Sequence, residues 1–416
     1  MLLITGGIAG LLLLRLVYML PVKPMEDNAK RSLAVLLREG PSYEMIPGIS
    51  ATRLDNYTDA LMINTALYDG KESAWKKAVA ALRYQYGDET AFESSISYLE
   101  GDDNFEAESY ARYWHGYLLV LKPLLLFFSY GEIRVINLMI ELALAGMLIA
   151  KMSERGLGVY IKAFLAGIFF LMPFTIPMSM QYSQIYYITA LAMLFLLKQY
   201  ERLKVRKMFE EFYFGVGMLT CFFDFLTYPI VVVGYTLILQ SILERNDTEE
   251  DTGKRVMSLI RNAVSWGSGY AGIWVMKWIL STVILKENVL KDAILSVLYR
   301  SSTGSSDTGV SITITRGEAL LENLNMVGNK VFLAAVLIYI LVIICHKIAG
   351  ATVRILAGKS FFIRAGMISS LPFIWILAIA NHSYVHCWMT YKMLSVAAFG
   401  VAVMLAALVE NDKEMK

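Results

Sequence analysis

Long apolar segments recur along nearly the whole chain, and they decide what it can fold into. A transmembrane helix needs about 17–25 predominantly apolar residues. We place such spans near residues 2–20, 134–150, 158–178, 183–197, 209–226, 228–243, 264–285, 330–346, 361–380 and 391–409. Hydrophobic residues make up 56% of the 416 residues and charged residues only 18%, whereas soluble domains are roughly 25% charged. The sequence therefore predicts an all-α polytopic membrane protein with about ten transmembrane helices.

Two clusters of basic residues give this bundle an orientation. The first comprises Lys198, Arg202, Lys204, Arg206 and Lys207, and the second comprises Lys347, Arg354 and Lys359. Short loops rich in Lys and Arg stay in the cytoplasm, so both clusters and the C-terminal tail are placed inside. The same count places residues 21–115, the turn around Gln181, residues 286–328 and the turn 381–392 outside.

This orientation requires residues 116–151 to cross the membrane only once. Residues 116–128 contain Lys122 and Pro123, so we read them as an interfacial or re-entrant helix. The predicted organisation is a first transmembrane helix (1–20), an external loop (21–115), the interfacial or re-entrant helix (116–133) and a transmembrane bundle (134–416). The first helix lacks a basic n-region and a cleavage site, so we expect an uncleaved span.

The first external loop is acidic, with ten Lys and Arg against sixteen Asp and Glu in residues 21–115. Three stretches of it have the pattern of amphipathic helices lying on the membrane. They are residues 58–68, a helical stripe of Trp75, Val79, Leu82 and Tyr86, and residues 105–117, whose aromatic side chains suit the headgroup layer.

Two carboxylates lie near the middle of this loop. Asp55 and Asp59 would share one face of a helix that begins here. On that face they could hold a divalent cation or a sugar hydroxyl, or one of them could act as a general base. Helix capping is the alternative, because an Asp in the first turn accepts hydrogen bonds from free amides and complements the helix dipole.

Histidines and other charged residues also gather on the external side. His382 and His386 are four residues apart, so they could jointly bind a phosphate or a metal ion, or belong to a polar turn. Asp224 ends an apolar run and should face the bundle or a cavity, where it would orient a neighbour. Arg112 could bind an anion or anchor the chain at the interface.

Several motifs that would point to other functions are absent. The sequence contains no Walker-type loop, no nucleophile elbow and no His-Glu-x-x-His motif, so ATP-driven transport, serine hydrolysis and zinc proteolysis have no support. Its three cysteines share no metal-ligand spacing, and no nucleic-acid-binding pattern is present.

The layout of one span, a large external loop, interfacial helices and a many-span bundle resembles the GT-C superfamily of integral-membrane glycosyltransferases. The branch of protein mannosyltransferases and aminoarabinose transferases is most similar. Asp55 lies where that superfamily places its acidic catalytic residue, although Asn56 follows it here in place of Glu. The stretch that leads into the second span is represented by Tyr113, Trp114, His115, residues 118–128, Gly131 and Arg134, without the His-Pro-Pro of the family.

The resemblance implies a GT-C-like bundle that transfers a sugar from a polyprenyl-phosphate-linked donor to a glycan, lipid or protein acceptor on the outer face. Asp55 would be the general base. The expected phosphate-binding residues are Arg112, His382, His386 and Lys392, and the other expected substrate-binding residues are Asp59, His115, Asp224 and Tyr391. Metal dependence stays open, and a divalent cation (Mg or Mn) would have Asp55 and Asp59 as its ligands.

Three other functions compete with this one, and the third is a non-catalytic scaffold, which only an activity measurement can exclude. A lipid-linked glycan flippase or transporter would line a path across the membrane with polar residues, whereas the polar residues here gather on one side. An O-antigen ligase or polymerase would have its large external loop late in the chain. Short cytoplasmic loops and a lean external region suggest cell-envelope glycan assembly in a prokaryotic plasma membrane.

Overall fold

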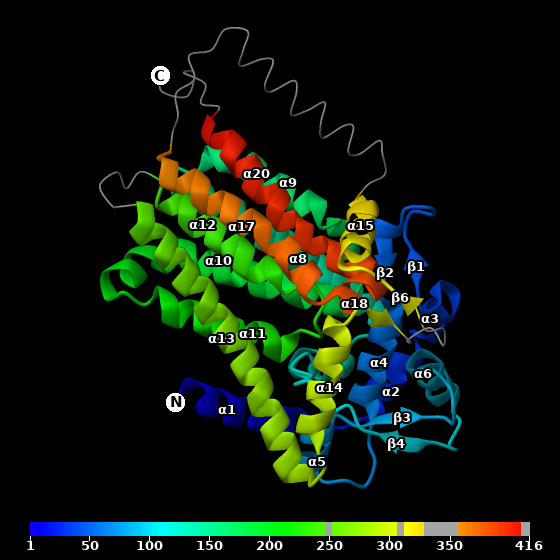
Figure 1. Cartoon of the computed structure of the whole chain (residues 1–416). Coiled ribbons are helices and arrows are strands. Elements are labelled where there is room, and N and C mark those ends of the chain that lie inside the picture. Colours follow the sequence, from blue (N-terminus) through cyan, green and yellow to red (C-terminus); the bar gives the residue numbers. More distant parts are fainter. Residues whose placement is uncertain (246–251, 306–311, 328–356, 409–416) are drawn as a thin grey trace.

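The structure, a computed structural model, describes residues 1–245, 252–305, 312–327 and 357–408. These residues are mainly helical, with three short antiparallel ribbons (Figure 1). Helices of the bundle are α1 (Leu2–Val17), α7 (Leu118–Leu125), α8 (Tyr130–Glu154), α9 (Gly158–Phe170), α10 (Met180–Arg206), α11 (Phe209–Phe223), α12 (Ile230–Leu243), α13 (Thr252–Leu285), α17 (Lys359–Ala378) and α20 (Ser395–Leu408). Shorter helices near its end are α14 (Val289–Ser301), α15 (Arg316–Val327), α18 (Ala380–Val385) and α19 (Cys387–Thr390).

Five helical segments of the described residues are long and apolar enough to cross a bilayer. They are α8, α10, α13, α17 and the continuous segment Cys387–Leu408. Helices α1, α9 and α12 are apolar but shorter. The prediction of a helical membrane protein is therefore confirmed, whereas the number of ten spans stays a prediction. The predicted span at residues 330–346 lies outside the described residues.

Helix α7 agrees with the interpretation of residues 116–128 as a non-crossing element. It has eight residues, so it is about 12 Å long, well short of a hydrocarbon core of about 30 Å. It packs against α1 and the loop helix α2 (Lys23–Lys30).

The loop between α1 and α7 is a folded unit. It contains α2, α3 (Leu33–Glu39), α4 (Asn56–Leu67), α5 (Ala74–Ala80) and α6 (Ala91–Glu100). Within this loop, strand β1 (Tyr43–Glu44) pairs with β2 (Arg53–Leu54), and β3 (Arg83–Gln85) pairs with β4 (Glu106–Glu108). The third ribbon lies later in the chain, where β5 (Gly304–Ser305) pairs with β6 (Ile312–Thr313). In Figure 1 the loop elements gather at one end of the bundle, beside α14, α15 and α18.

Long-range strand pairing shortens one of the helices predicted in this loop and replaces another. The stripe that starts at Trp75 ends early, because Ala81 adopts a left-handed conformation (φ 48°) and the next residues form β3. The aromatic stretch 105–117 is β4 followed by turns, and a helix begins only at Leu118. Local periodicity could not reveal these strands, since each is stabilised by a partner distant in sequence.

Helix α4 confirms the predicted helix at residues 58–68 but does not lie on the membrane. Ten of its twelve residues are buried, on all of its faces. The side chain of Asn64 accepts from the Tyr84 backbone amide (2.8 Å) and donates to the Tyr84 carbonyl (3.0 Å), which attaches β3 to the helix. Helix α4 is therefore the core of the loop unit.

A buried polar network fixes this unit on the bundle. The guanidinium of Arg134 in α8 forms an ion pair with Glu39 (2.9 Å) and donates to Asn56 Oδ1 (2.8 Å) and to the Tyr130 hydroxyl (2.7 Å). Buried charges are stable only when paired and hydrogen-bonded, and here both conditions hold. Because Asn56 is the first residue of α4, the network also fixes the residue before it, Asp55.

Candidate functional site

Asp55 caps the N-terminus of α4. Its carboxylate accepts hydrogen bonds from the Thr58 amide (3.1 Å) and the Thr58 hydroxyl (2.9 Å), and a third from the side-chain amide of Gln181 in α10. A carboxylate has about four lone-pair sites, so one remains for a ligand. Burial raises the pKa of Asp55, and the bonds from Thr58 and Gln181 oppose that rise. The capping interpretation is confirmed, and it leaves room for a chemical role.

Asp55 also lines a cavity of about 420 Å³, which we call the Asp55 cavity. Its wall includes Asp55, Tyr57, Tyr110, Arg300, His382 and His386. Three residues selected from the sequence, Asp55, His382 and His386, thus meet in one space although they come from opposite ends of the chain. The backbone amide of Asp55 donates to the Ser179 hydroxyl (3.0 Å), so α10 and its preceding turn hold the carboxylate in place.

The histidine pair has a defined tautomer at one ring. Nε2 of His382 lies 2.7 Å from the Leu226 carbonyl oxygen, and because a carbonyl only accepts, Nε2 is the protonated nitrogen. Nδ1 of His382 is buried and has no hydrogen-bond partner among the described residues. Burial, with His386 and Arg300 nearby, holds the pKa of His382 well below its usual value. His382 is therefore a neutral acceptor, not the phosphate donor expected from the sequence.

The positive charge at the site comes from two arginines instead. Arg112 and Arg300 line a cleft of about 350 Å³, the arginine cleft, which shares Arg300, His382 and His386 with the Asp55 cavity. Arg112 forms an ion pair with Asp292 of α14 (3.1 Å), which lines the same cleft, and the Arg112 side chain is 29% exposed. The Arg300 guanidinium lies 5.9 Å from the Tyr113 ring centroid. Arginine is well suited to phosphate because its planar fork donates two parallel hydrogen bonds.

An apolar groove leads away from these two arginines. This tryptophan groove, of about 370 Å³, lies between α13, α14 and α17 and also contacts Arg112 and Arg300. Its lining includes Trp266, Tyr270, Trp274 and Trp278, which follow each other at four-residue intervals along α13, and Trp375 of α17. The groove is therefore an apolar surface with a cationic end, and it runs along two helices, α13 and α17, that are long and apolar enough to cross a bilayer.

Asp59 does not reach the Asp55 cavity. It is fully buried and accepts hydrogen bonds from the Met180 amide (2.9 Å) and the Tyr130 hydroxyl (2.5 Å). Burial raises its pKa to about 7. Asp55 and Asp59 therefore have separate partners, and no group of three or more His, Cys, Asp or Glu side chains within the described ranges is arranged to hold a metal ion. The structure thus gives Asp59 a structural role rather than the predicted cation- or substrate-binding one.

Lys392 and Tyr391 are likewise structural. The ammonium group of Lys392 is buried and donates to the Leu171 carbonyl (2.8 Å), the Thr175 hydroxyl (2.9 Å) and the Tyr391 hydroxyl (3.3 Å). An ammonium group has three protons, so all of them are used. The Tyr391 hydroxyl in turn donates to the Ala51 carbonyl (2.8 Å). The expectation that Lys392 binds a lipid phosphate does not hold, and Tyr391 joins the bundle to the loop unit.

His115 and Asp224 act on the cavity through their neighbours. The two ring nitrogens of His115 contact the Tyr110 carbonyl (2.8 Å) and the Tyr117 hydroxyl (3.2 Å), and burial lowers its pKa to about 3. His115 thus supports the turn that presents Tyr110. Asp224 accepts from the Thr227 amide (2.9 Å) and hydroxyl (2.5 Å), as an orienting residue would. This turn contains Leu226, whose carbonyl fixes His382.

The sequence did not single out Arg300, Asp292 or the function of Gln181. Arg300 lies in a region predicted to be external, where an arginine departs from the usual bias toward cytoplasmic loops. The aromatic residues at four-residue intervals along α13 could also have been recognised from the sequence.

Comparison with known proteins gives no match: no family model, no curated protein and no solved structure is significantly similar to this chain.

Proposed function

We propose that the protein is a membrane glycosyltransferase that transfers a sugar from a polyprenyl-phosphate-linked donor to an acceptor hydroxyl on the outer face of the membrane. One observation supports this above the others. A buried carboxylate with a lone pair to spare, Asp55, lines a cavity that adjoins a two-arginine cleft at the end of an apolar groove. Such a reaction needs a base for the acceptor hydroxyl, a site for the anionic phosphate and an apolar surface for the lipid chain.

The proposed chemistry is a single displacement. The acceptor hydroxyl oxygen forms a bond to the anomeric carbon while the bond from that carbon to the lipid phosphate oxygen breaks. The electron pair of the broken bond stays on the phosphate, and the hydroxyl proton passes to Asp55. Arg112 and Arg300 stabilise the negative charge that develops on the leaving phosphate. The ring of His382, held by the Leu226 carbonyl, forms part of the wall that orients the sugar.

The lipid chain of the donor occupies the tryptophan groove in this proposal. Removing a methylene of the chain from water is favourable by about 0.8 kcal/mol, so a groove lined by aromatic rings is a favourable surface for it. In this proposal the chain lies along the aromatic side chains of α13, and the lipid phosphate binds at the end of the groove where Arg112 and Arg300 lie.

We expect Arg300→Gln to raise the KM for the lipid-linked donor by roughly tenfold or more, because a hydrogen bond to a charged group contributes about 1.5–3 kcal/mol. Steady-state transfer by the purified protein in lipid nanodiscs, at varied donor concentration, measures this. Arg155→Gln removes a charge from the exposed end of α8, remote from the cavities, and is the matched control. An unchanged KM in Arg300→Gln would remove the proposed phosphate site.

The pH dependence of transfer should reveal Asp55, which must be deprotonated to accept the proton. As the pH is lowered, Asp55 becomes protonated and kcat/KM falls. Because burial raises the pKa of Asp55, this fall should begin at a higher pH than for an exposed aspartate. The pH dependence of stability has the opposite sign. A carboxyl whose folded-state pKa is raised stabilises the fold at low pH, and this contribution is lost as pH rises through the folded-state pKa. Parallel measurements of transfer and of the melting temperature against pH separate the two effects. Loss of activity that coincides with acid unfolding would count against Asp55 as the base.

A further inference from the structure

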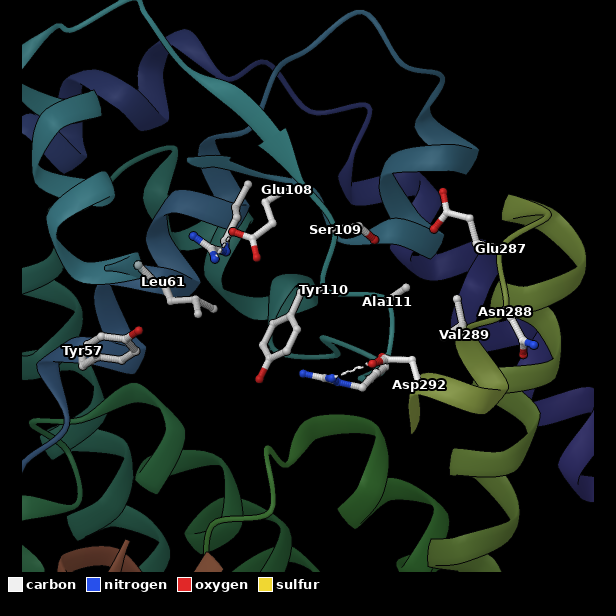
Figure 2. A pocket seen from close by; sticks show the side chains of 13 residues that line it. Tyr57, Leu61, Glu108, Ser109, Tyr110, Ala111, Glu287, Asn288, Val289 and Asp292 are labelled. Carbon is white, nitrogen blue, oxygen red and sulfur yellow. Dashed lines mark hydrogen bonds and ion pairs between the residues drawn. The ribbon is translucent and has the colours of Figure 1, made fainter. Parts of the chain in front are cut away.

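A larger polar cavity adjoins the Asp55 cavity, and of the residues given a chemical role above it contains only Arg112. This ribbon cavity, of about 580 Å³, lies between the β3–β4 ribbon, α4 and the start of α14 (Figure 2). Tyr57, Leu61 and Tyr110 line both cavities, so the two share a wall. Its volume falls within the range of about 300–1,000 Å³ that is typical of ligand pockets. A ligand bound in it would have one end beside the space that Asp55 lines.

We infer that the ribbon cavity binds the acceptor and that this acceptor is a saccharide without acidic groups. The inference deepens the proposed function and rests on it only for the word acceptor. The saccharide specificity follows from the charges and the aromatic side chains of the cavity itself.

Charges in the ribbon cavity are paired across its wall. Arg83 forms an ion pair with Glu108 of β4, and Arg112 forms one with Asp292 at 3.1 Å, as the dashed lines of Figure 2 show. Glu287 adds a third carboxylate to the lining. An anionic ligand would meet three carboxylates, and a strongly cationic one would meet two guanidinium groups. A neutral ligand avoids both costs.

The same pairs offer hydrogen bonds of both kinds. Guanidinium groups only donate and carboxylates only accept, and each retains capacity beyond its ion pair. A sugar hydroxyl donates one hydrogen bond and accepts others, so a wall that alternates fixed donors and fixed acceptors matches it. Because each arginine is already held by its carboxylate, little side-chain freedom is lost when a hydroxyl binds.

Two tyrosines supply the apolar part of the surface. The side chain of Tyr57 is 39% exposed, and Tyr110 is half-buried against Tyr113 with ring centroids 5.2 Å apart. Figure 2 shows Tyr110 in the middle of the cavity, with Tyr57 on the α4 side and Asp292 on the α14 side. An aromatic ring with a polar tip suits a sugar ring, which has an apolar C–H face and a polar rim. A lipid acceptor would find few apolar walls here.

Oligosaccharide binding tests this directly. The full-length protein in lipid nanodiscs is applied to immobilised soluble oligosaccharides grouped as neutral, amino-bearing or carboxylate-bearing, and retention is measured. We expect retention on neutral oligosaccharides and binding roughly tenfold weaker or worse in Ser109→Trp, because an indole at this exposed lining position fills the cavity. Asn104→Trp adds the same side chain at an exposed turn before β4, outside the lining, and should bind like the wild type.

A second variant keeps the inference testable if Ser109→Trp fails to fold. Glu287→Gln removes the third carboxylate, so it should gain retention of carboxylate-bearing oligosaccharides. Retention of none of the neutral oligosaccharides, or equal binding by the wild type and Ser109→Trp, overturns the inference. Saccharide binding without any sugar transfer would refute the proposed function alone. Transfer at the wild-type rate by folded Ser109→Trp, to a peptide or a lipid, would refute the acceptor site alone.

Discussion

Replacing Asp55 with Asn should lower sugar transfer by about 10²–10⁴-fold, the usual contribution of a general base, while the protein still inserts and folds. The fold should survive because Asn is as good an N-cap as Asp, so its side-chain oxygen can still accept from the Thr58 amide. The substitution removes the group that takes the proton. It also replaces Oδ2, which accepts from the Thr58 hydroxyl and the Gln181 side chain, so these two groups must turn to accept from the new amide. Transfer by the purified variant, measured beside its melting temperature, is the readout.

Asp59→Asn is the matched control for this prediction. Both carboxylates are buried near the start of α4, but Asp59 bonds to Met180 and Tyr130 and does not line the Asp55 cavity. We expect it to change the melting temperature more than it changes transfer. Full activity in Asp55→Asn would remove the proposed base. Loss of transfer in an Asp59→Asn protein that is as stable as the wild type would contradict the purely structural role assigned to Asp59.

The placement of the candidate site residues at the same end of the bundle could be predicted from the sequence. Counting spans between two basic loops placed Asp55, Gln181 and the histidine pair on the same side, and the structure brings them into contact with one cavity. This worked because the side on which a loop lies depends on few variables: the number of spans and the bias of Lys and Arg. The external location itself stays a prediction.

The roles of individual charges could not be predicted in the same way. Lys392 and Arg300 are both cations near the same end of the bundle, yet Lys392 is fully satisfied by buried oxygens whereas Arg300 lines three cavities. The difference depends on which carbonyls lie within reach after packing. Spacing along the sequence contains no information about that.

Strand β3 shows the same limit at the level of secondary structure. The stripe from Trp75 to Tyr86 has helical spacing, but Arg83 pairs with Glu108 and Asn64 holds the Tyr84 backbone. Tertiary hydrogen bonds thus outweighed a local preference that amounts to a fraction of a kcal/mol per residue, about 0–0.7 for ordinary residues. The ribbon cavity exists because of this pairing, since Glu108 and Ser109 line it.

Filling the tryptophan groove should separate the lipid chain of the donor from its sugar. Gly267 lines the groove, and a Cβ added there would meet no atom within 4 Å, so Gly267→Trp can project an indole into the groove without a clash at its base. We expect the KM for a long-chain polyprenyl-phosphate donor to rise by roughly tenfold or more, because displacing only two methylenes from an apolar surface costs about 1.6 kcal/mol. Transfer in nanodiscs at varied donor concentration measures this.

Two comparisons make that result specific to the groove. Gly146→Trp places the same side chain on α8 at another glycine with open space around it, outside the groove lining, and should leave the KM unchanged. A donor analogue with a short lipid chain should be used poorly by the wild type and no worse by Gly267→Trp, because it has little chain to displace. If instead both donors suffer equally, the indole acts on the phosphate end through Arg112 or Arg300, and the groove is not where the chain binds.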